Sequence, residues 1–150
     1  MVEMDIKIYF LGAFIISVIG GILMLTTEFG GWYGVTYLGY GSYLYEWGSI
    51  SAFSGPGGAL LILMAIFLFY CSVISVLGLI DPDKIPNKLF ILVGVFLSIL
   101  VFIITLISGA IFVIAVWDAA EWWFGAAFYA GIISGILTPI FLFLAWKNIE

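Results

Sequence analysis

Residues 58–117 read GALLILMAIFLFYCSVISVLGLIDPDKIPNKLFILVGVFLSILVFIITLISGAIFVIAVW, and this stretch decides the fold. It contains two long apolar runs, 58–80 and 89–117, separated by the short segment DPDKIPNK. An apolar run of roughly 18 or more residues predicts a transmembrane helix. Pro82 and Asp83 favour a turn, and Pro86 favours a helix start shortly after it. The stretch therefore predicts two antiparallel membrane helices joined by a tight connection.

Two further apolar runs, 8–25 and 124–146, lie on either side of this pair. Of the 150 residues, 65% are hydrophobic and only 9% are charged, whereas about 25% of residues in a soluble domain are charged. We therefore expect an all-α integral membrane protein. It should form one domain over 1–150, a four-transmembrane-helix bundle with an outer loop at 26–57. The run 89–117 is longer than the roughly 30 Å hydrocarbon core requires, so we expect that helix to tilt or protrude.

The basic residues give an orientation. The chain has four lysines and no arginine, and Lys7, Lys84, Lys88 and Lys147 all fall at one end of the predicted bundle. The positive-inside rule makes that end cytoplasmic. Both termini are then expected in the cytoplasm of a multi-pass protein of the plasma membrane, with 26–57 outside.

The outer loop shows the alternation expected of β-strands. Around Val35–Tyr37 and Tyr43–Trp47, aromatic or β-branched residues recur at every second position, which is the strand pattern. The segment 39–42, Gly-Tyr-Gly-Ser, can form a turn. We expect a small β-hairpin resting on the outer mouth of the bundle. The alternative is an irregular loop in the lipid interface, where Trp and Tyr are favoured.

This chain lacks the residues that most catalytic and metal sites require. There is no histidine, no arginine and a single cysteine, Cys71, so a catalytic triad, a His-ligated haem, a Cys-based cluster and a common zinc site are excluded. The predicted spans hold no ionisable Asp, Glu, Lys, Arg or His, which argues against ion-coupled transport. The net charge of −5 argues against a nucleic-acid partner. We expect no enzyme activity, no cofactor and no metal.

Acidic residues are the remaining polar candidates outside the membrane. Four of them fall on the predicted outer side as a candidate acidic cluster: Glu28, Glu46, Asp118 and Glu121. Asp118 and Glu121 would share a face if their segment were helical, and could meet a cation or a basic residue of a partner. The alternative is an interfacial turn with charges in water and Trp117, Trp122 and Trp123 at headgroup depth.

Small residues recur at four-residue spacing in three of the spans. They are Ser17 and Gly21, then Gly94 and Ser98, then Ala127, Gly131 and Gly135. Such ridges let helix backbones approach closely in lipid. They predict either packing among this chain's own helices or a surface for oligomers and larger complexes.

The overall plan resembles the claudin/PMP22-type tetraspan family. Trp32, soon after the first span, and Trp47, further along the loop, are loosely similar to that family's W…GLW…C…C signature, although the loop has no cysteine and no Gly-Leu-Trp triplet. The resemblance implies that these two tryptophans fix the loop to the bundle. It also implies an adhesion, barrier or accessory role.

These observations favour a non-catalytic tetraspan protein that acts through protein–protein contacts, by self-assembly or as an accessory subunit of a membrane complex. The candidate interaction face, toward lipid headgroups or a partner, is Trp32, Tyr37, Tyr43, Tyr45 and Trp47. Two alternatives remain at this point. One is a channel or carrier for a small solute with an acidic outer vestibule, and the other is a lipid-directed enzyme using Asp118 or Glu121.

Overall fold

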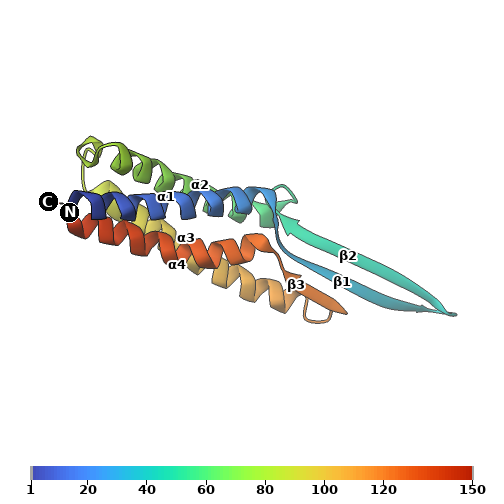
Figure 1. Cartoon of the computed structure of the whole chain (residues 1–150). Helices are drawn as coiled ribbons and strands as arrows, with labels where there is room; N and C mark the ends of the chain where they lie inside the picture. Colours follow the sequence, from blue (N-terminus) through green and yellow to red (C-terminus); the bar gives the residue numbers. More distant parts are fainter. Residues whose placement is uncertain (1, 150) are drawn as a thin grey trace.

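The computed structural model describes residues 2–149, and the side chains of 4–149. The elements in chain order are α1 (Val2–Thr26), β1 (Glu28–Gly39), β2 (Ser42–Ser51), α2 (Pro56–Ile80), the short 3₁₀ helix η1 (Pro82–Lys84), α3 (Leu89–Ala115), β3 (Glu121–Phe124) and α4 (Ala126–Asn148). Within the described residues, four helices are long and apolar enough to cross a membrane. The four predicted helices are therefore confirmed, and all four are candidate membrane spans. Figure 1 shows them side by side, with both termini at one end and the strands at the other.

The helix bounds differ from the predicted spans mainly at the ends. α1 begins at Val2 rather than near residue 8, because helix formation does not require the first residues to be apolar. α3 ends at Ala115 and not at Trp117, and α4 begins at Ala126 and not at Phe124. α4 begins later than predicted because Phe124 belongs to the strand β3.

The outer segments form a three-stranded antiparallel sheet of order β2-β1-β3. The predicted hairpin is confirmed, and the irregular-loop alternative is wrong. Its turn lies where predicted: Gly39, Tyr40 and Gly41 all have positive φ, at 91°, 52° and 78°, which glycine adopts at little cost. The third strand was not predicted. It forms because residues 30–33 of β1 would otherwise leave an open edge, and 121–124 pair with them.

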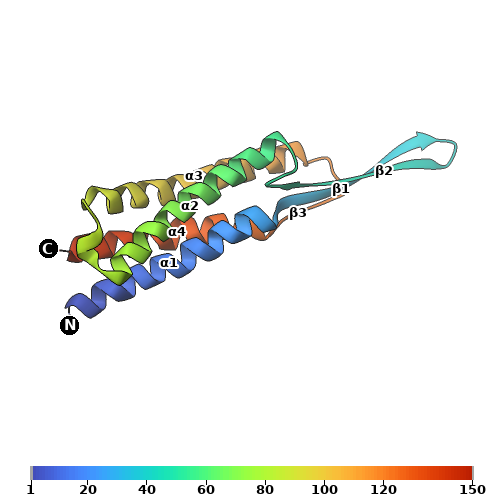
Figure 2. The ribbon, with the colours of Figure 1, turned by 90° about the horizontal axis from the view of Figure 1, so that it is seen from above.

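Only the base of the hairpin rests on the outer mouth of the bundle. The prediction that the whole hairpin lies there is wrong (Figures 1 and 2). Figures 1 and 2 show β1 and β2 continuing beyond the bundle as a two-stranded ribbon. Pairing with β3 ends at Tyr33, and the rest of β1 reaches roughly 20 Å further at about 3.3 Å per residue. We call residues 34–47 the distal ribbon. In the described structure β3 does not pair with this part of β1, so β1 and β2 pair there only with each other.

The core of the bundle has two buried clusters. One, toward the sheet, includes Met24, Phe29, Leu61, Met64 and Phe112. The other, toward the termini, includes Phe10, Cys71, Ile91 and Leu142. Among neighbouring helix pairs, α2 and α3 contact each other least. The seam between these two helices is therefore the loosest side of the bundle.

Candidate functional site

The two faces of the hairpin differ in what they touch. Residues directly opposite each other on paired strands share a face, and successive residues alternate. The register pairs Tyr33 with Trp47, Val35 with Tyr45 and Tyr37 with Tyr43. These side chains therefore lie on one face, which we call the aromatic face: Tyr33, Val35, Tyr37, Tyr43, Tyr45 and Trp47.

The aromatic face is uncovered along the distal ribbon. Tyr37, Tyr45 and Trp47 have exposed fractions of 62%, 60% and 79%. Its rings contact one another instead. The Tyr37 and Tyr43 centroids are 5.2 Å apart, and Tyr33 stacks on Tyr45 at 6.2 Å. The structure thus brings together four of the predicted interaction residues (Tyr37, Tyr43, Tyr45 and Trp47). Tyr33 was missed, although the same period-two pattern extends to it.

Trp32 lies on the opposite face, toward the bundle. Its ring centroid is 6.4 Å from that of Phe112 in α3, and its ring lies so close to Gly48 across the strand pair that no side chain would fit there. Trp32 therefore packs the sheet against the bundle core. The resemblance implied that Trp47 also fixes the loop to the bundle, and this expectation is wrong. Trp47 lies opposite Tyr33 on the aromatic face and is exposed.

The base of the sheet is held by a hydrogen bond and by close ring packing. The Trp123 indole Nε1–H of β3 donates to Glu28 Oε1 of β1 at 3.1 Å. The Trp123 ring covers Gly31, its partner across the strands, and leaves no space for a Cβ. Phe29 packs edge-on against Phe112, Phe124 and Phe128, at centroid separations of 6.3, 6.5 and 5.5 Å. The glycines near Trp32 and Trp123 therefore make room for indole rings.

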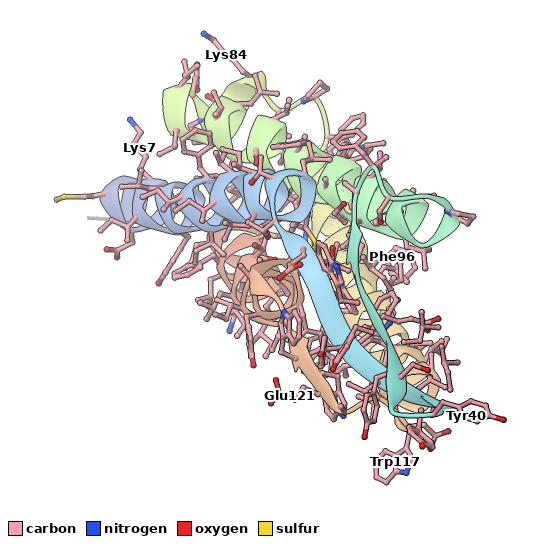
Figure 3. The ribbon with its side chains drawn as sticks, turned by 90° about the vertical axis from the view of Figure 1, so that its right-hand side faces the viewer. Lys7, Tyr40, Lys84, Phe96, Trp117 and Glu121 are labelled. Atoms are coloured by element: carbon pink, nitrogen blue, oxygen red, sulfur yellow. The ribbon has the colours of Figure 1, made fainter. Side chains whose placement is uncertain are left out.

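The four predicted outer acids have different surroundings. Glu28 accepts the Trp123 hydrogen bond, whereas Glu46 and Asp118 line one pocket. Glu121 is exposed at the β3 edge, where Figure 3 labels it. Asp118 precedes β3 in a turn and Glu121 is in the strand, so the segment is not helical and the condition for a shared helical face is not met. In residues 2–149, no group of three or more His, Cys, Asp or Glu side chains could hold a metal ion.

The pocket has a volume of about 520 Å³ and lies between the bundle-facing side of the hairpin and the outer ends of α2 and α3. We call it the basal pocket. Its buried apolar part is formed by Phe29, Leu61, Met64, Phe112 and Val116. Among the described residues that line it, Glu46 and Asp118 are the charged ones. The sequence identified both acids as candidates but could not place them at one cavity. They are far apart in the chain, and tertiary packing brings their segments to the same pocket.

The small residues of the predicted ridges are buried between the helices of this chain. All seven, Ser17, Gly21, Gly94, Ser98, Ala127, Gly131 and Gly135, are buried. Ser17 Oγ lies 2.8 Å from Ser72 Oγ of α2, and a Cβ on Gly135 would meet the backbone of Phe102 in α3. The ridges therefore serve internal packing.

The hydroxyl groups of the spans are mostly bonded within their own helices. Ser72 donates to Leu68 O at 3.0 Å and Ser75 to Cys71 O at 2.7 Å. Thr105 donates to Val101 O at 2.7 Å and also lies 3.3 Å from Met64 Sδ. In the described part of the chain, Thr138 Oγ1 is a buried side-chain oxygen without a hydrogen-bond partner. No observation here favours a polar path for a solute.

Comparison with known proteins adds no relative: no family model, no curated protein and no solved structure matches this chain. The claudin/PMP22-type resemblance is therefore neither supported nor contradicted, and it stays a prediction.

Proposed function

We propose that this chain is a non-catalytic four-span membrane protein that binds a partner protein, or a second copy of itself, through the aromatic face of its projecting hairpin. The observation that carries the proposal is the uncovered ladder of rings on the distal ribbon. Exposed aromatic side chains are enriched at the centres of protein interfaces, where they contribute most of the binding free energy. The ribbon points away from the bundle (Figure 2), so these rings reach beyond the lipid-covered helices.

The free edge of β2 favours a protein partner over lipid headgroups. β2 pairs only with β1, so its other edge presents unpaired backbone N–H and C=O groups. Natural edge strands are usually protected from pairing by lysine, proline or bulges. The β2 sequence, SYLYEWGSIS, contains neither lysine nor proline, and the irregularities in its pairing with β1 lie near the two ends of β1, at Glu28–Gly30 and Tyr37–Gly39. An added strand from a partner would satisfy these groups while its side chains meet the tyrosines.

The proposed orientation places the hairpin outside the plasma membrane and both termini in the cytoplasm. It is supported by the lysines, which all belong to the end of the bundle that carries the termini. The lone Cys71 is buried, so introduced cysteines can report the sides. In a C71A background, Tyr40→Cys should react with a membrane-impermeant maleimide on intact cells, and Lys84→Cys should react only after permeabilisation. The reverse pattern would invert the topology.

A photo-crosslinking residue at position 45 tests the partner directly. With p-benzoylphenylalanine replacing Tyr45 in the full-length protein in its native membrane, we expect one defined crosslinked product. A product of twice the chain's mass indicates self-assembly, and a heavier or lighter adduct identifies an accessory role. Adding the serine substitutions Tyr37→Ser, Tyr43→Ser and Trp47→Ser should abolish it.

The matched control carries the same photo-residue at Phe53. This side chain is as exposed as Trp47, at 79% for each, but follows β2 at the bundle end of the hairpin. Equal crosslinking from positions 45 and 53 would indicate non-specific collisions and contradict the proposal. So would a strictly monomeric protein in several mild detergents and in nanodiscs that yields no adduct from position 45.

A further inference from the structure

We propose that the basal pocket is a binding site for a membrane amphiphile with an apolar chain and a positively charged amine head, which enters from the bilayer between α2 and α3. This inference goes beyond the proposed partner contact and does not depend on it. It rests on three features of the pocket: its apolar wall, its opening at the α2–α3 seam and its two carboxylates.

The wall suits a hydrocarbon chain. Leu61, Met64 and Phe112 are at most 3% exposed and form the inner side of the pocket. The volume of about 520 Å³ falls within the roughly 300–1,000 Å³ typical of small-molecule sites. An α-helix with its side chains is about 10 Å across and would fill this space within little more than one turn. A lipid chain fits the cavity better than a partner helix does.

The opening lies on the outer side of the hydrogen bonds that join α2 to α3 in the described structure. Toward the termini the seam is closed by Tyr70 Oη donating to Phe90 O at 3.1 Å and by Cys71 Sγ donating to Gly94 O at 3.2 Å. At mid-height Thr105 Oγ1 contacts Met64 Sδ. Above this level the pocket begins.

The rims of this opening face outward from the bundle. Leu60 of α2 and Ile111 of α3 line the pocket and are 44% and 62% exposed. Both belong to helices that are apolar enough to span a membrane, so their exposed surface faces lipid in the membrane. A bilayer molecule can therefore enter sideways without crossing water.

The head of the ligand is specified by charge. Glu46 from the hairpin and Asp118 from the turn after α3 are the charged side chains of the lining. The lysines lie in or beside α1, η1, α3 and α4, at the end of the bundle that carries the termini, and no lysine is among the described residues that line the pocket. An ammonium group would offset one of the two negative charges and could donate hydrogen bonds to the carboxylates. An anionic head would be repelled.

Photolabelling in nanodiscs tests the site with the full-length protein. The probes are three long-chain molecules that carry the same diazirine in the chain and differ only in the head: a primary amine, an alcohol and a carboxylate. We expect the amine to label peptides containing Leu60–Met64 and Ser108–Phe112 at least tenfold more efficiently than the carboxylate, with the alcohol between them. A tenfold ratio corresponds to about 1.4 kcal/mol.

Two pairs of variants separate charge from shape. Glu46→Gln with Asp118→Asn should reduce amine labelling to the level of the alcohol and leave alcohol labelling unchanged, whereas Glu121→Gln, at an exposed acid outside the lining, should change neither. Ala115→Phe fills the pocket from α3 and should reduce labelling by all three probes. Its control, Ala110→Phe, places the same ring on an exposed position of α3 outside the lining.

Several results would overturn the inference. Equal labelling by the amine and the carboxylate would remove the charge recognition. Labels spread evenly over the lipid-facing helix surfaces would show that the pocket does not concentrate the probe. Unchanged labelling in Ala115→Phe would show that the probe lies elsewhere, provided that the variant elutes and unfolds like the unaltered protein.

Discussion

The helix bundle and the hairpin use the same residue types for opposite purposes. In the bundle, glycines such as Gly131 and Gly135 allow side chains and backbone of α3 to approach α4. In the hairpin, Gly31 and Gly48 allow indole rings to lie across a strand. Beyond Tyr33, Tyr37, Tyr43 and Tyr45 pack on neighbouring tyrosine rings and remain exposed. The bundle therefore satisfies its own packing, whereas the distal ribbon has surface to offer to another molecule.

The largest expected effect is a loss of stability from a substitution in the helix bundle. Gly135→Leu forces a side chain into the backbone of Phe102, and overpacking of a core by a bulky group costs typically 1–3 kcal/mol, so we expect about 3 kcal/mol of lost stability. The measurement is unfolding of the full chain by SDS titration in mild micelles. Ile136→Leu, at the adjacent exposed position, is the control and should behave like the unaltered protein. A stable Gly135→Leu protein would contradict the tight α3–α4 contact.

A second change sharpens the comparison within the hairpin itself. Trp32 packs on Phe112, whereas Trp47 is exposed. We expect Trp32→Ala to lower the free energy of unfolding by about 2 kcal/mol, less than for a fully buried aromatic residue. Trp47→Ala should lower it by less than about 0.5 kcal/mol, as at most surface positions. Equal losses in the same SDS titration would show that the two faces are not distinct.

A smaller effect of opposite sign concerns a single hydroxyl in the bundle. Thr138 Oγ1 is buried and unpartnered in the described structure, so Thr138→Val, which keeps the shape, should raise stability by about 1 kcal/mol. Thr105→Val is the matched control. It removes a hydroxyl that donates to Val101 O and should lower stability by a similar amount. A loss in both variants would mean that Thr138 is satisfied in the folded protein.

The smallest effect is expected from shortening the distal ribbon. Replacing residues 37–43 with Asn-Gly joins Thr36 to Leu44, which are already opposite each other, through a favoured two-residue turn. The free energy of unfolding of the bundle should change by less than about 0.5 kcal/mol, while crosslinking from position 45 should disappear. Marked destabilisation of the helices would show that the ribbon supports the fold and not only a contact.

The sequence predicted the features that depend on local composition and period. Run length predicted the four spans, and alternation around Val35 and Tyr45 predicted the hairpin with its turn at Gly39–Ser42. The strand at Glu121–Phe124 escaped prediction because four residues carry little periodicity, and its partner on β1 is distant in sequence. The basal pocket escaped for the same reason, since Glu46 and Asp118 line one cavity only after α3 has packed beneath the hairpin. Whether small residues face inward or outward could not be predicted, because the spacing is the same for both.

The position of β3 has a consequence for the order of synthesis. Proteins emerge from the ribosome from the N-terminus onward, so β1 and β2 are made directly after the first span, whereas β3 follows the third. Until residues 121–124 have been made, Gly30–Tyr33 of β1 have no partner on their second edge, and the Trp123 ring that covers Gly31 is absent. Completion of the sheet therefore requires that α3 has already been made, and a chain stopped before β3 would leave residues 30–33 of β1 unpaired on that side.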